Sequence, residues 1–184
     1  LTTHQTNCFN EIMSDLSRSF PMNRLLQGDV GSGKTIVATM AALQAIKNGG
    51  QVGFMAPTEI LAEQHFIKLK EWLNPLHISV AFLSGSISLA EKKIIYAKLI
   101  KGDIDLLVGT HALIQDKVKF KSLALYIIDE QHRFGVEQRL QIRSNNITST
   151  HVEAHQLMMS ATPIPRTLSM SYFADMDIST ISEL

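Results

Sequence analysis

Residues 28 to 35, GDVGSGKT, combine three glycines with a lysine and a threonine, between an apolar run and a helix-like run. Glycine lets the backbone curl until several N–H groups point into one hollow. That hollow, with the positive end of the following helix, suits a di- or triphosphate. The spacing of glycine, four residues, glycine, lysine and threonine therefore predicts a phosphate-binding loop. The alternative is a glycine-rich turn with an incidental lysine.

The residues of this loop have separate expected roles. Lys34 reaches the terminal phosphates, where it assists the reaction, and the Thr35 hydroxyl is a ligand for Mg²⁺. The expected nucleotide contacts are Gly28, Asp29, Gly31, Ser32, Gly33, Lys34 and Thr35.

Two adjacent carboxylates, Asp129 and Glu130, follow the apolar run LALYII. Burying such a pair in a core would be costly, whereas the carboxyl end of a parallel strand opens into the crevice where these sheets bind ligands. There Asp129 holds Mg²⁺, through water, and Glu130 orients or deprotonates a water that attacks the γ-phosphate. The alternatives are a solvated acidic turn or the cap of a following helix.

Short apolar runs alternate with helix-like segments along the chain, and these elements must position the candidate residues. The runs lie near 24–27, 51–55, 78–83, 104–108, 123–128 and 156–159. Because they are apolar on both faces, they predict a parallel sheet buried under helices on both sides, an α/β fold. Helices are expected over 4–18 and 59–73, and the polar segment 144–154 as a surface loop.

Composition limits the class of protein. The 184 residues are 45% hydrophobic, enough for one domain with a sizeable core, and 17 basic residues balance 17 acidic ones. Any nucleic-acid contact must therefore be local rather than made by bulk charge. The one cysteine, Cys8, is either a reactive thiol or a small packing residue on the first helix, and it indicates a reducing, cytoplasmic compartment. No signal peptide or membrane-spanning run is expected.

The order of motifs resembles that of superfamily 2 helicases, and specifically the RecG family of DNA translocases. Similarity covers essentially the whole chain, and the segments DEQHRFGV and TPIPRTL are more specific than the widely shared GKT and DE. Members of the Mfd family share TPIPRTL but have a second glutamate where Gln131 stands. The matching segments are LTTHQ, GDVGSGKT, APTEILAEQH, VGTHALIQ, IIDEQHRFGVEQR and MSATPIPRTL.

The resemblance implies a RecA-like P-loop NTPase domain with ATP and Mg²⁺ as cofactors, and Gln5 as the residue that reads adenine. It also implies contacts with the backbone of one DNA strand, which are independent of base sequence. Thr58 suits a helix N-cap as well, and His111 alone would be an ordinary loop histidine. The implied DNA contacts are Pro57, Thr58, Ser84, Gly85, Gly109, Thr110 and His111.

A further set of residues is implied to couple the nucleotide site to the DNA. The alternative is that they simply bridge adjacent strands. The set comprises Gln131, His132, Ser160, Ala161 and Thr162. The loop beside them contains Arg133, Phe134 and Arg139, and the resemblance implies that this aromatic loop senses DNA; the alternative is that Phe134 packs in the core.

The resemblance also implies that residues 1–184 are one lobe of a longer protein, with a branch-binding wedge domain before it and a second RecA-like lobe after it. The whole would be an ATP-driven helicase that remodels branched DNA, such as stalled forks and Holliday junctions, in recombination and repair. The alternatives are an Mfd-like translocase on double-stranded DNA, an RNA helicase, a P-loop kinase or GTPase, and a non-catalytic binding module. The guanine signature Asn-Lys-x-Asp is absent from the sequence.

Overall fold

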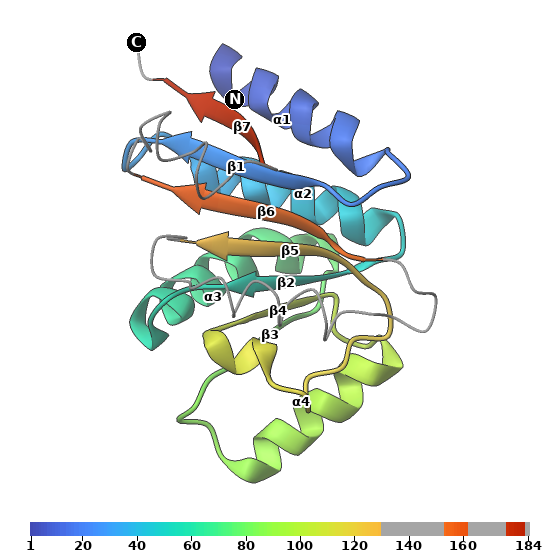
Figure 1. Ribbon diagram of the computed structural model, residues 1–184. Coiled ribbons are helices and arrows are strands. Elements are labelled where there is room, and N and C mark those ends of the chain that lie inside the picture. Colours follow the sequence, from blue (N-terminus) through green and yellow to red (C-terminus); the bar gives the residue numbers. More distant parts are fainter. Residues whose placement is uncertain (130–152, 162–175, 183–184) are drawn as a thin grey trace.

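A fully parallel sheet forms the centre of the computed structural model, which describes residues 1–129, 153–161 and 176–182. The strands are ordered β3-β4-β2-β5-β6-β1-β7, and their arrowheads in Figure 1 all point to the same side. The elements are α1 (Thr3–Leu16), β1 (Asn23–Gly28), α2 (Lys34–Lys47), β2 (Gln51–Met55), α3 (Glu59–Leu73), the 3-10 turn η1 (Asn74–Leu76), β3 (Val80–Leu83), α4 (Leu89–Lys101), β4 (Leu106–Gly109), the 3-10 turn η2 (His111–Ile114), β5 (Leu123–Asp129), β6 (His155–Ser160) and β7 (Asp177–Ile181).

The six strands expected from apolar runs are all present, and helix α3 has the expected bounds. Helix α1 ends at Leu16 rather than at residue 18, because the chain turns at Ser17. Strand β7 was not predicted. It lies at the edge of the sheet, and only Ser179 and Ile181 of its five residues are buried, so it lacks a continuous apolar run. Most of the expected loop 144–154 lies outside the described residues.

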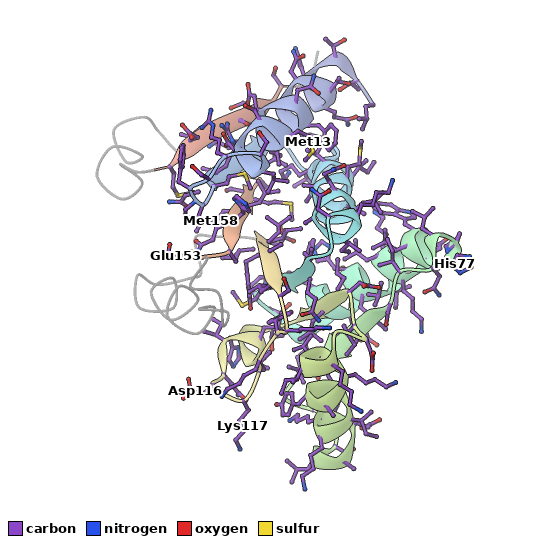
Figure 2. The ribbon with its side chains drawn as sticks, turned by 90° about the vertical axis from the view of Figure 1, so that its right-hand side faces the viewer. Met13, His77, Asp116, Lys117, Glu153 and Met158 are labelled. Carbon is purple, nitrogen blue, oxygen red and sulfur yellow. The ribbon has the colours of Figure 1, made fainter. Side chains whose placement is uncertain are left out.

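Helices cover both faces of the sheet, as predicted. Side chains of α1, α2 and α3 form one core with β-strand residues such as Phe54, while α4 and η2 pack with residues such as Tyr126 on the other face. In Figure 2, Met13 lies on the side of α2 and Met158 points to the opposite face. Among the described helices, none has the length and apolar character needed to cross a membrane.

The single cysteine, Cys8, packs in the first of these cores and is 3% exposed. Burial raises the pKa of its thiol, and the nearby Glu11 carboxylate adds to the effect. A buried thiol with a raised pKa is a poor nucleophile, because the reactive form is the thiolate. Of the two interpretations of Cys8, packing is therefore the one that the structure supports.

A buried arginine attaches α1 to the edge of the sheet. Arg24 of β1 donates from Nε to Asp15 Oδ2 at 2.7 Å and from Nη1 to Ser179 Oγ of β7 at 2.8 Å. The Arg24 and Asp15 side chains are only 10% and 3% exposed. Glu11 of α1 also pairs with Arg24 at 3.3 Å and accepts a short hydrogen bond from Ser179. The network therefore holds α1, β1 and β7 in one arrangement.

Removing the buried partner should cost far more stability than removing the exposed one. Asp15→Ala leaves Arg24 buried with weaker partners and should lower the free energy of unfolding by about 3 kcal/mol. Arg18 pairs with the same carboxylate at 2.9 Å but is 43% exposed, so Arg18→Ala should cost less than about 1 kcal/mol. Urea denaturation at pH 7 measures both values, and equal losses for the two variants would contradict this account.

Candidate nucleotide and nucleic-acid site

The candidate residues lie along the side of the sheet where the strands end, which we call the carboxyl edge. All paired strands run parallel, so their carboxyl ends meet there (Figure 1). Strands β1, β5, β6 and β7 end near the residues expected to hold the nucleotide. Strands β2, β3 and β4, which are neighbours in the other half of the sheet, end at the residues expected to contact DNA. The sheet edge is therefore divided into two adjoining halves.

The phosphate loop joins β1 directly to α2. Gly31 and Gly33 have φ of +88° and +89°, and Gly33 is the N-cap of α2, so the loop needs the left-handed backbone that glycine provides. A Cβ on Gly33 would collide with the Gln5 side chain. Lys34 Nζ donates to the carbonyls of Gly28 and Asp29, at 2.5 and 2.7 Å. The lysine amine thus contacts the backbone at the start of the glycine-rich loop.

The Gln5 side chain makes two hydrogen bonds with the backbone of this chain. Its Nε2 donates to the Ser32 carbonyl at 2.9 Å, and its Oε1 accepts from the Thr2 N–H at 2.9 Å as part of a capping box that begins α1. The side chain therefore ties the start of α1 to the phosphate loop. Its contact with adenine stays a prediction.

Two cavities adjoin the loop, and β7 contributes to both. The larger, about 540 Å³, lies between the start of α1, the phosphate loop and the residues Ile181 and Ser182. The smaller, about 240 Å³, brings Ala161 next to Gly28 and Asp29. The structure thus adds the end of β7 to the site, which the sequence reasoning missed because β7 itself was missed.

Asp129 ends β5, as predicted, and its side chain is 16% exposed. Its Oδ2 lies 2.6 Å from Nε2 of His65 on α3. Thr35 lies in the first turn of α2, half-buried. Among the described residues, no three histidine, cysteine or acidic side chains gather as metal ligands. The Thr35 hydroxyl and the Asp129 carboxylate fit Mg²⁺, which is typically held by one or two protein oxygens together with phosphates and water.

The expected DNA contacts lie at or just after the ends of three neighbouring strands, β2, β3 and β4, but several use their side chains internally. The hydroxyl of Thr58 caps α3 and that of Thr110 caps η2. Ser84 is fully buried, and its Oγ pairs with that of the exposed Ser86 at 2.8 Å. Contacts from these positions would therefore rely on backbone groups. Pro57 is half-buried, Gly109 is buried, and Gly85 and His111 are exposed.

Two charged residues that the sequence reasoning missed brace the loop after β3. Glu59 Oε1 accepts from the Ser86 N–H at 3.3 Å, and Lys92 Nζ donates to the Gly85 carbonyl at 2.9 Å. Glu59 follows Thr58 directly, so it connects the ends of β2 and β3. Nothing in the local sequence pattern indicates the Glu59–Ser86 contact, because the two residues lie 27 positions apart.

Two residues of the coupling set lie at the end of β6. Ser160 ends β6 and pairs in register with Gln27 of β1, while Ala161 follows it. Glu130, Gln131, His132, Phe134 and Thr162 lie outside the described residues, as do Arg133 and Arg139. Their roles stay predictions.

Filling the space beside Gly28 should damage the phosphate loop. A Cβ there would lie 2.6 Å from Ser32 Oγ and 2.9 Å from the Ile181 carbonyl, so the loop or β7 must move. We expect Gly28→Ala to weaken binding of a fluorescent Mg²⁺-ATP analogue by at least about tenfold, which is roughly 1.4 kcal/mol.

Gly49 provides the control for this substitution. It has a φ of +84°, lies beyond the far end of α2, and has no neighbouring atom within 4 Å of the position that a Cβ would occupy. Gly49→Ala should cost roughly 1–2 kcal/mol of stability through backbone strain and leave nucleotide affinity unchanged. Unaltered binding by Gly28→Ala would mean that the phosphate loop is not the nucleotide site.

Comparison with known proteins places this arrangement in a family. Residues 2–171 match the model of the DEAD/DEAH box helicase family. The whole chain is 55% identical to the ATP-dependent DNA helicase RecG of Aquifex aeolicus and 50% identical to that of Bacillus subtilis. The chain spans 23% and 26% of the lengths of these relatives.

Solved structures agree with the sequence comparison. A RecG protein bound to a three-way DNA junction has a TM-score of 0.85 and 44% identity, over 100% of this chain and 24% of that one. The helicase MrfA bound to DNA has a TM-score of 0.75 at 19% identity, over 100% of this chain and 27% of its own, which shows the shared fold. Such family membership implies nucleotide binding with a divalent metal. The chain belongs to the DEAD/DEAH box helicase family and is similar over its whole length to RecG helicases.

Proposed function

We propose that this chain is the ATP-binding motor lobe of a RecG-like DNA helicase that couples ATP hydrolysis to the remodelling of branched DNA. The observation that carries the proposal is the single sheet edge, which brings the phosphate loop, Asp129 and the expected strand contacts together. Similarity to RecG proteins over the whole chain favours this function over an Mfd-like translocase.

The chain's own residues suggest how the reaction is supported. Amides of the loop 28–35 and the Lys34 amine bind the phosphates, and Thr35 and Asp129 hold Mg²⁺. When bound, Mg²⁺ neutralises charge on the terminal phosphates. Glu130 orients the attacking water and accepts its proton.

The remaining parts of the proposal concern the longer protein. The relatives are about four times longer than this chain, which supports a second RecA-like lobe and a branch-binding wedge domain in the complete protein. The substrates would be stalled forks and Holliday junctions, in recombination and repair. The buried, unpaired Cys8 is compatible with a reducing cytoplasmic location.

Substitutions of the two carboxylates should have different effects on nucleotide binding and hydrolysis. Glu130→Gln keeps size and polarity but cannot accept a proton, so it should bind Mg²⁺-ATP and lose hydrolysis. Asp129→Asn should lose metal-dependent binding as well. Equilibrium binding and steady-state hydrolysis in the full-length protein measure the two effects. Normal turnover by Glu130→Gln, or equal loss of binding in both variants, would show that the roles are wrongly assigned.

Hydrolysis should need more than this lobe. Residues 1–184 alone should hydrolyse ATP very slowly with or without DNA, because an arginine finger from a second lobe is worth roughly 10³–10⁵ in rate in other phosphoryl-transfer systems. The full-length protein should be strongly stimulated by a three-way DNA junction. The comparison is of ATPase rates for both chains, with linear duplex and single-stranded RNA as controls. Robust DNA-stimulated turnover by the short chain, or stimulation by RNA alone, would contradict the proposal.

A further inference from the structure

Asp129 has a partner that its proposed role does not require. His65 on α3 and Asp129 at the end of β5 are 64 residues apart in sequence, yet His65 Nε2 lies 2.6 Å from Asp129 Oδ2. Both side chains are largely buried, at 14% and 16% exposed. Because an ionised carboxylate only accepts hydrogen bonds, Nε2 must carry the hydrogen and donate it.

The orientation of the His65 ring is set by packing rather than by the carboxylate alone. The ring lies against Phe54 of β2, with ring centroids 4.7 Å apart. Phe54 is fully buried, and β2 is the direct neighbour of β5 in the sheet. Helix α3 is itself fixed at its start by the Thr58 cap and packs on β3 and β4. The donor is therefore held in place before any ligand binds.

We propose that His65 is a positioning residue for Asp129. Its hydrogen bond holds one oxygen of the carboxylate and prevents the group from rotating, which leaves the other oxygen for the metal. Groups that orient a metal ligand in this way usually contribute 10–100-fold to metal affinity or activity. The inference rests on the proposed function, because it assumes that Asp129 serves Mg²⁺.

Two substitutions distinguish the hydrogen bond that His65 donates from the packing of its ring. His65→Phe keeps an aromatic ring against Phe54 but has no donor, whereas His65→Gln keeps an N–H donor at a similar distance from the backbone. Glu63→Gln is the control, since Glu63 is exposed on the same helix. In the full-length protein, binding of a fluorescent, non-hydrolysable ATP analogue is titrated over a range of Mg²⁺ concentrations, and thermal unfolding is recorded for each variant.

We expect His65→Phe to raise the half-saturating Mg²⁺ concentration by about 10–100-fold while nucleotide affinity without Mg²⁺ stays as in the unaltered protein. His65→Gln should recover most of the loss, and Glu63→Gln should behave as the unaltered protein does. In hydrolysis assays at saturating ATP, excess Mg²⁺ should restore the rate of His65→Phe.

Three results would overturn the proposal. One is an unchanged Mg²⁺ dependence in His65→Phe. Another is an equal loss in His65→Phe and His65→Gln together with lowered unfolding temperatures, which would show that His65 acts through packing. The last is nucleotide binding by the unaltered protein that does not depend on Mg²⁺, because it would remove the proposed role of Asp129 before any variant is compared.

Discussion

The parallel pairing of the strands decides where the candidate residues lie. Each strand from β3 across to β7 runs in the same direction, so each carboxyl end reaches the same edge of the sheet. Residues that are far apart in sequence, such as Gly28, Asp129 and Ser160, are brought to the same ends of the strands because β6 pairs with both β1 and β5. A register slip in β1 or β5 would displace Gly28 or Asp129 relative to the other candidate residues.

Because β2 and β5 end on the same side of the sheet, α3 can contact residues at the ends of both strands. The helix is capped by Thr58, shortly after the end of β2, and about two turns later His65 contacts Asp129 of β5. Seven residues of helix span roughly 10 Å. Helix α3 thus joins the half of the sheet expected to contact DNA to the half expected to hold the nucleotide, and Glu59 in its first turn braces the loop after β3. These links use side chains that lie outside the phosphate loop.

Much of this arrangement could be predicted from the sequence, because short local patterns of residues determine it. The glycine spacing in 28–35 and the apolar run before Asp129 are local patterns that span only a few residues, so the strand, turn and helix around the loop and the strand before Asp129 were predicted correctly. The apolar runs of β2, β3 and β4 were predicted for the same reason. The His65–Asp129 and Arg24–Asp15 pairs could not be predicted, because each depends on where separate segments pack. In the sequence, His65 stood out only as the last residue of the segment APTEILAEQH. Strand β7 was missed because an edge strand alternates in burial and carries polar residues.

We propose that nucleotide phosphates bind at the carboxyl ends of the strands, between the phosphate loop and Asp129. Hydrogen–deuterium exchange of this chain, with and without a saturating Mg²⁺-bound ATP analogue, is the decisive experiment because exchange reports on each backbone amide. Binding at this place should slow exchange of the amides of residues 28–35 and of those flanking Asp129, with exchange in α4 unchanged. The protection should be lost in Lys34→Ala. Protection confined to other segments, or protection of 28–35 that persists in Lys34→Ala and without Mg²⁺, would contradict it.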